Sequence, residues 1–139
     1  MTTQQRSDHP APAILVIDDE DYVADMLASA LEIEHYTVHL AYNGRQGWDL
    51  VQSITPDLII IDLMMPYLNG EALAAQIRAD PRLARVPIIL MSAGARPSKL
   101  VPITTFVAKP FDLFQMLALI DTKIGSGDRP AEGKQSQQP

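Results

Sequence analysis

Short runs of apolar residues alternate along this chain with longer segments in which apolar residues recur every three or four positions. The runs lie at residues 13–17, 37–41, 58–62, 86–92 and 104–109. The run at 58–62 contains Ile59, Ile60 and Ile61 in succession and is bounded by Pro56 and Pro66. A run that is apolar at successive positions, rather than at alternate ones, predicts a strand buried on both faces of a sheet.

The segments between the runs predict helices at residues 21–35, 44–54, 70–78 and 111–124, because their apolar residues are spaced for one helix face. Asn-Gly pairs at 43–44 and 69–70 precede the second and third helices, and Pro56 and Pro81 follow them. Strands and helices that alternate with short connections are typical of a doubly wound α/β sheet with parallel strands.

The length of 139 residues is enough for one domain and too short for two. Residues 1–12 and 125–139 are rich in polar residues, glycine and proline, a composition that buries too little apolar surface to become ordered. We therefore expect a folded domain at residues 13–124 between two disordered tails, the second of which could be a linker. The sequence leaves open whether this is a stand-alone protein or part of a longer chain.

Composition excludes several classes of function. The net charge of −6 and the pI near 4.8 argue against a nucleic-acid surface, which needs a basic patch. The absence of cysteine excludes a disulfide framework, a thiolate nucleophile and a cysteine metal site. No apolar run approaches the roughly 20 residues of a membrane span, and the first residues do not form a signal peptide. We expect a cytoplasmic protein that contacts neither nucleic acid nor membrane directly.

Polar side chains follow four of the five predicted strands. Asp18 and Asp19 follow the first, Asp62 the third, Ser92 the fourth and Lys109 the fifth. The carboxyl ends of parallel strands meet at one edge of the sheet, where ligands bind in this class of fold, so we expect these side chains to lie together. Taken alone, Asp62 would more often be a residue that ends a strand and caps a turn. Its companions favour a functional role.

The charges at this edge predict a cation and a nucleophile. Each close pair of carboxylates repels by roughly 4 kcal/mol at an effective dielectric of 20, so protons or a cation must lie among them. A cluster of oxygen ligands without histidine or cysteine favours Mg²⁺. With the cation bound, Asp62 is a plausible nucleophile toward phosphorus, while Lys109 adds positive charge and Ser92 a hydrogen bond.

These motifs, in this order, resemble the receiver domain of two-component response regulators. The resemblance covers residues 14–124 and implies a flavodoxin-like fold with five parallel strands in the order 2-1-3-4-5. The residues that carry it are Asp18-Asp19, Asp62-Leu63-Met64-Met65-Pro66 with Asn69-Gly70, Ser92-Ala93, and Phe106-Val107-Ala108-Lys109-Pro110-Phe111.

The resemblance implies roles for the residues around Asp62. Asp62 would accept a phosphoryl group from the phosphohistidine of a sensor histidine kinase or a histidine phosphotransfer protein, and Ser92 and Lys109 would hold the phosphoryl oxygens. Ser92 and Phe106 would act as the switch, although Phe106 could also be an ordinary sheet aromatic. The Lys109–Pro110 peptide would be cis, an isomer with a low penalty only before proline.

The resemblance also implies a metal site and a slow reversal. Asp19, Asp62 and the backbone carbonyl of Met64 would bind Mg²⁺, with Asp18 acting through water. Met64 and Gly94 lie at the positions that tune hydrolysis of the phosphoryl group in the family, and neither side chain can hydrogen-bond an attacking water. We expect a signalling receiver that assists its own phosphorylation and dephosphorylates slowly, and not an enzyme with a further substrate.

Three other classes were weighed against this interpretation. A flavin mononucleotide binder of the same fold would place phosphate at the first strand end, where residues 18–21 are all acidic. A phosphatase of the haloacid dehalogenase type uses an acid two residues after its nucleophile, where this chain has Met64. A receiver-like adaptor that binds its partner without phosphorylation remains the open alternative.

The connection between the last two predicted strands is short. It comprises residues 93–103, whereas a parallel crossover needs about a dozen residues. Pro97 and Pro102 bracket the one candidate helix, at residues 98–101, and the residue before a proline favours extended geometry. We expect the fourth helix of the family to be short or missing, the segment to be irregular or mobile, output to use another surface, and the family's usual dimer not to form.

Overall fold

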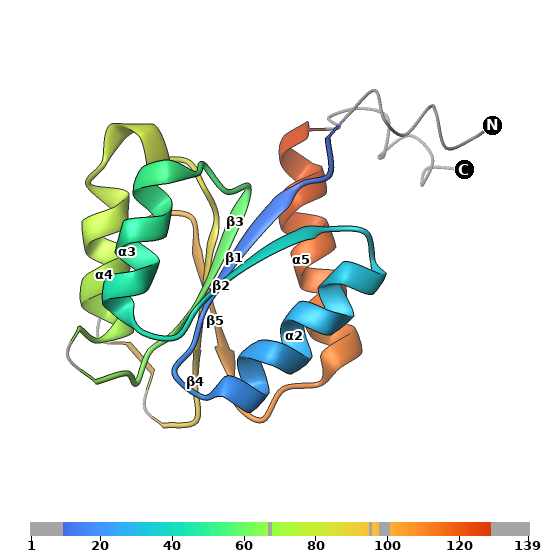
Figure 1. Cartoon of the computed structure of the whole chain (residues 1–139), viewed down its shortest axis with the longest axis horizontal. Coiled ribbons are helices and arrows are strands. Elements are labelled where there is room, and N and C mark those ends of the chain that lie inside the picture. The colour runs from blue at the N-terminus through green and yellow to red at the C-terminus, as the bar shows by residue number, and fades with distance from the viewer. Residues whose placement is uncertain (1–9, 67, 95, 98–100, 129–139) are drawn as a thin grey trace.

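The computed structural model describes residues 10–66, 68–94, 96–97 and 101–128. Its five parallel strands form one sheet in the order β2-β1-β3-β4-β5 (Figure 1). This order confirms the flavodoxin-like fold expected from the sequence. The strands are β1 (Ala13–Ile17), β2 (Thr37–Ala41), β3 (Leu58–Asp62), β4 (Ile88–Ser92) and β5 (Thr104–Ala108).

Helices cover both faces of the sheet (Figure 1). α2 (Asp21–Ile33) and α5 (Leu113–Asp128) pack on one face, and α3 (Gly44–Ser53) and α4 (Gly70–Arg78) pack on the other. A short 3-10 helix, η1 (Pro81–Leu83), follows α4. In the part of the chain that the structure describes, no helix has the length and apolar character needed to cross a membrane.

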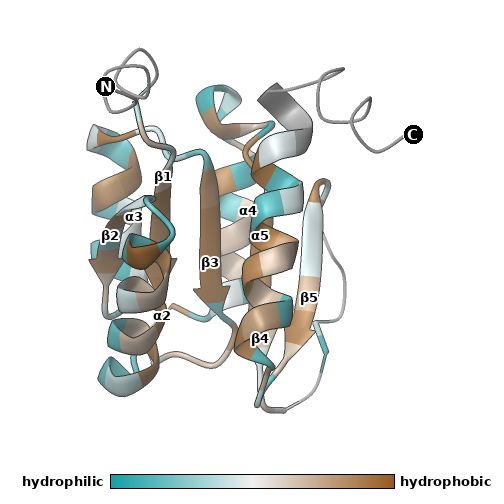
Figure 2. Cartoon of the chain, turned by 90° about the vertical axis from the view of Figure 1, so that its right-hand side faces the viewer, coloured by the Kyte–Doolittle hydropathy of each residue, from teal (hydrophilic) through white to brown (hydrophobic). Residues whose placement is uncertain are grey.

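The central strand β3 is buried at every position. Ile59 and Ile61 contribute to the core beneath α3 and α4, whereas Leu58 and Ile60 contribute to the core beneath α2 and α5. Figure 2 shows β3 hydrophobic along its length, while β5 at the edge begins with polar residues. The consecutive apolar residues of β3 therefore serve two cores at once, as the sequence pattern predicted.

The two Asn-Gly pairs begin helices. The side chains of Asn43 and Asn69 accept hydrogen bonds from the backbone N–H groups of Gln46 and Ala72, each at 2.8 Å. The glycine at position 70 is also required by packing, because a Cβ there would clash with the backbone carbonyl oxygen of Asp62. The start of α4 is thus pressed against the backbone at the end of β3.

The last helix differs from its predicted bounds. It begins at Leu113 instead of residue 111, because the side chain of Asp112 accepts a hydrogen bond from the backbone N–H of Gln115 at 3.1 Å and so caps the helix. It continues to Asp128, past the predicted end at residue 124, since the cost of a glycine in a helix is only about 1 kcal/mol. Of the two predicted tails, residues 1–9 and 129–139 lie outside the described residues.

The connection between β4 and β5 contains no helix among residues 93–94, 96–97 and 101–103, in agreement with the expected loss of the fourth helix. Most of the candidate turn at 98–101 lies outside the described residues. Ile103 ends the connection with a φ of 56°, which is unusual for a β-branched residue. Its carbonyl accepts hydrogen bonds from the N–H of Ile88 at 3.0 Å and from Nη2 of Arg78 at 3.3 Å. The end of this connection is therefore tied to β4 and α4.

Candidate functional site

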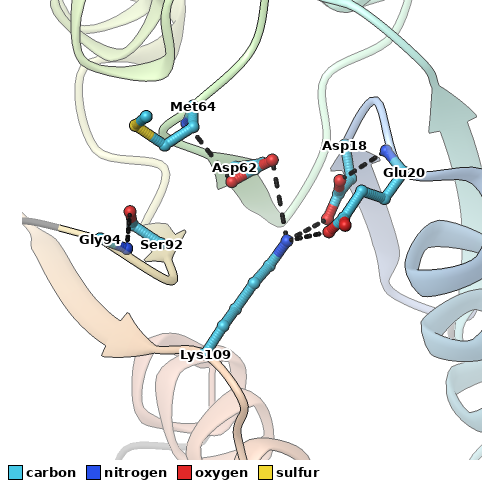
Figure 3. Close-up of polar contacts among 7 residues, drawn as sticks. All are labelled: Asp18, Glu20, Asp62, Met64, Ser92, Gly94 and Lys109. Atoms are coloured by element: carbon cyan, nitrogen blue, oxygen red, sulfur yellow. Dashed lines mark hydrogen bonds and ion pairs between the residues drawn. The ribbon is translucent and has the colours of Figure 1, made fainter.

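The carboxyl edge of the sheet gathers acidic side chains around one lysine (Figure 3). Lys109 extends from the end of β5, and its Nζ lies 3.1 Å from Oδ2 of Asp18 and 3.7 Å from Oδ2 of Asp62. The backbone N–H of Lys109 donates to the carbonyl of Ser92 at 2.9 Å, which fixes the lysine beside the end of β4. Three separate strands thus supply the acid, the acceptor candidate and the cation.

Of the three carboxylates paired with Lys109, Glu20 lies nearest, with its Oε1 2.9 Å from Nζ. Burial of the Lys109 ammonium lowers its pKa, but the hydrogen bond with Glu20 and the charge of Asp18 outweigh that effect, so the pKa lies above its usual value. The ammonium is therefore charged at neutral pH and available to anionic groups at this edge.

Asp62 has a strongly perturbed carboxyl group. Its side chain is almost fully buried, and burial together with the charge of Asp18 raises its pKa to about 7. Two groups lower the pKa of Asp62: the Lys109 ammonium and the N–H of Met64, which lies 3.4 Å from Oδ1 of Asp62. The charge of Asp19 raises the pKa by a smaller amount. Without a cation, this carboxyl is partly protonated at neutral pH, and a bound cation would favour the carboxylate.

Asp18 lies fully buried at the end of β1. Burial raises its pKa, while the backbone N–H of Glu20, which donates to Oδ1 at 2.9 Å, and the Lys109 ammonium both lower it. The balance leaves the pKa above its ordinary value. Burial is the main cause of the raised pKa of both carboxyls, and the Lys109 ammonium offsets it only in part.

The oxygen atoms available to a metal ion come from Asp18, Glu20 and Asp62, and one carboxylate oxygen of each lies within 4.8 Å of the others. Donors of this kind fit Mg²⁺, which prefers oxygen ligands and retains several waters. Asp19, predicted as a direct ligand, is exposed and lies outside this group, although its charge reaches Asp62. The backbone carbonyl of Met64 remains a predicted ligand. The side chain of Met64 is 64% exposed.

The two predicted switch residues are partly engaged elsewhere. Ser92 is fully buried, and its Oγ accepts a hydrogen bond from the N–H of Gly94 at 3.0 Å (Figure 3). The ring of Phe106 packs against the core beneath α3 and α4, and the guanidinium carbon of Arg96 lies 4.8 Å from the ring centroid. The Lys109–Pro110 peptide is cis, as the resemblance implied.

Two contributors to this site were not identified from the sequence. Glu20 belongs to the acidic run at 18–21, so the run itself was a signal, but the residue pair before it was preferred. Arg96 gives no signal in the sequence, because its contact with Phe106 joins residues that are far apart along the chain.

Five parallel strands in this order, with acids, a hydroxyl and a lysine at their carboxyl ends, define the receiver class. The family model of the response regulator receiver domain matches residues 14–121, and the chain belongs to this family.

Its relatives include regulators and kinases. The DNA-binding dual master transcriptional regulator RpaA of Synechocystis sp. is 33% identical over 132 residues, which are 91% of this chain and 55% of that protein. Hybrid signal transduction histidine kinase D of Dictyostelium discoideum is 32% identical over 121 residues, 84% of this chain but 8% of the kinase. The chain therefore spans little more than half of the first relative and a small part of the second.

A solved structure shows the same fold. The signal receiver domain of a signal transduction histidine kinase from Syntrophus aciditrophicus superposes with a TM-score of 0.77 at 27% identity, covering 88% of this chain and 96% of that domain.

Proposed function

We propose that this receiver is a phosphoacceptor in which Asp62 takes a phosphoryl group from the phosphohistidine of a sensor histidine kinase or a histidine phosphotransfer protein. In the transfer, a carboxylate oxygen of Asp62 forms the new bond to phosphorus. The P–N bond breaks, and the imidazole nitrogen keeps its electron pair. The observation that carries the proposal is the buried Asp62 carboxyl with the Lys109 ammonium 3.7 Å away.

Lys109 and Ser92 would receive the phosphoryl oxygens. The ammonium of Lys109 is already charged and needs only to shift from Glu20 or Asp18 toward the new oxygens. The hydroxyl of Ser92 would donate to a phosphoryl oxygen, and its rotation would release the N–H of Gly94.

The acidic cluster supports Mg²⁺ as the cofactor. Asp18, Asp62 and one of the neighbouring acids Asp19 and Glu20 would hold the ion, together with the carbonyl of Met64. When bound, Mg²⁺ supplies the positive charge that screens the incoming phosphoryl oxygens. The acids themselves would position the ion, while the Lys109 ammonium favours the deprotonated form of the Asp62 carboxyl.

The test is phosphate labelling in the presence and absence of Mg²⁺. We expect the wild type to incorporate label from a phosphorylated donor only with Mg²⁺, and Asp62→Ala to incorporate none, because the acceptor oxygen is lost. Asp57→Ala is the matched control, since Asp57 precedes β3 and its carboxylate accepts from the N–H of Ala13 at 2.7 Å at the opposite edge. Label retained at the wild-type rate in Asp62→Ala would mean that another residue is the acceptor.

A wild-type protein that takes no label from any donor and does not bind beryllofluoride would instead favour the adaptor that works without phosphorylation.

If Asp62 is phosphorylated, the new charge would alter the edge of the sheet that carries Ser92 and Phe106. Phosphorylation would thereby change the binding of a downstream protein.

A further inference from the structure

A groove of about 580 Å³ opens beside the acceptor, between the loop after β3 and the segment after β4. Leu63 and Met64, which directly follow Asp62, form part of its wall, so the groove lies next to the proposed phosphoryl position. Its lining is mainly apolar, and the described residues that line it include one cation, Arg96, and one carboxylate, Glu71. The lining residues are Leu63, Met64, Met65, Asn69, Glu71 and Arg96.

Arg96 is held in this groove by an aromatic ring. Its guanidinium carbon lies 4.8 Å from the centroid of Phe106, within the distance of a cation–π contact. Among the described residues, no carboxylate forms an ion pair with Arg96. Phenylalanine is a weaker partner for a cation than a charged group is, so the guanidinium is available to an anion that arrives nearby.

The backbone that carries Arg96 is connected to the site through Ser92. The Oγ of Ser92 accepts the N–H of Gly94, two residues before Arg96. If Ser92 turns to a phosphoryl oxygen, this N–H loses its acceptor. Phosphorylation would then bring negative charge to Asp62 and remove a backbone contact two residues before Arg96.

We propose that Arg96 is a further phosphoryl-binding residue, which leaves the ring of Phe106 and pairs with the phosphorylated Asp62. This inference rests on the proposed function. Guanidinium and phosphoryl oxygens form paired, charge-assisted hydrogen bonds that are about twice as strong as neutral ones, so the phosphoryl group outcompetes the ring. The transfer of Arg96 uncovers Phe106 and so reports the charge at Asp62 to the α3–α4 side of the sheet.

The first test measures the affinity of the full chain for beryllofluoride in saturating Mg²⁺, because this anion occupies the phosphoryl position on a carboxylate without a donor protein. Arg96→Ala should weaken binding about tenfold or more, the effect of losing hydrogen bonds between charged groups. Arg96→Lys should lose part of that affinity, because it keeps the charge but not the planar pair of donors. Arg85→Ala is the charge-matched control and should bind as the wild type does, since Arg85 is exposed and precedes β4 at the opposite edge.

The second test separates a direct role from a general disturbance of the segment. Phe106→Leu removes the ring that competes for Arg96 and should tighten beryllofluoride binding severalfold in the wild-type background. In the Arg96→Ala background the same substitution should change nothing, because the guanidinium is gone. The tightening in the wild-type background is the result that a purely structural role does not produce, because the loss of a packing contact alone would weaken binding or leave it unchanged.

The outcomes distinguish the two proposals. If the wild type binds beryllofluoride and Arg96→Ala binds equally well, the role of Arg96 is wrong and the phosphoacceptor function stands. An equal effect of Phe106→Leu in both backgrounds also overturns the role of Arg96. A wild type that does not bind the anion at all overturns both proposals.

Discussion

The strand that carries Asp62, β3, and the strand that Lys109 follows, β5, lie in opposite settings. β3 has a neighbouring strand on each side and helices on both faces, and each of its residues is buried. β5 has one neighbouring strand, its residues are partly or fully exposed, and the described part of the segment before it contains no helix. Asp62 therefore lies in a tightly packed part of the sheet, while Phe106 lies in a less tightly packed edge strand and Lys109 directly follows that strand.

This contrast suggests how a site can be both fixed and responsive. In the proposed function, Asp62 would have to keep its geometry toward the donor and the metal ion, and the tight packing of β3 favours that. The groups that change partners on phosphorylation need alternatives within reach, and the edge strand provides those. Lys109, with three carboxylate partners, connects the two settings.

The largest expected effect tests the packing contrast itself. Ile60→Ala in β3 should lower the free energy of unfolding by about 4 kcal/mol, because it leaves a cavity in a fully buried site. Val107 in β5 packs against the same core cluster but is only partly buried. Val107→Ala should therefore lower the free energy of unfolding by only about 1 kcal/mol. Urea unfolding of the two variants measures the difference, and equal costs would contradict the contrast.

The next effect concerns pH in the absence of divalent metal. The pKa of Asp62 is about 7 in the folded protein and near 4 in the unfolded chain, so the folded state binds more protons between these values. The free energy of unfolding should therefore fall as the pH rises from about 4 to 7, by on the order of 3 kcal/mol from this group. The raised pKa of Asp18 acts in the same direction.

Unfolding curves in EDTA at several pH values check this dependence. Asp62→Asn should flatten it and raise stability at pH 8, because no charge is then buried at that position. Added Mg²⁺ should also oppose the loss of stability. An Asp62→Asn protein with the wild-type pH dependence would show that another group is responsible.

The smallest effect concerns the lifetime of the phosphoryl group. Neither Met64 nor Gly94 can orient water through its side chain, so we expect slow loss of label. Met64→Asn combined with Gly94→Glu should speed this loss about tenfold, which is less than an ideally positioned acid or base contributes. A Cβ at position 94 would lie 3.8 Å from Oγ of Ser92, an ordinary contact, so the backbone there accepts a side chain without a clash at Cβ. Loss of label within seconds from the unmodified protein would contradict the expectation.

Much of this architecture was predictable because its causes are local. The strand at 58–62 follows from its consecutive isoleucines, and the start of α4 follows from the cap at Asn69. The sequence could not predict whether Asp19 or Glu20 lies nearer to Asp18 and Asp62. That arrangement depends on how the side chains pack around Lys109, which comes from another strand end. The contact of Arg96 with Phe106 likewise arises only after the chain has folded.

The residue at position 70, where α4 begins, is restricted by the backbone of Asp62 and Leu63. Helix propensity alone would rank alanine above glycine at this position. A methyl group there would push against the backbone of Asp62 and Leu63, so the residue that improves the helix would displace the acceptor. The backbone at the end of β3 therefore restricts which residue can stand at position 70. A substitution such as Gly70→Ala, chosen for helix propensity alone, would be expected to stabilise the helix but to move Asp62 and so weaken the proposed phosphorylation.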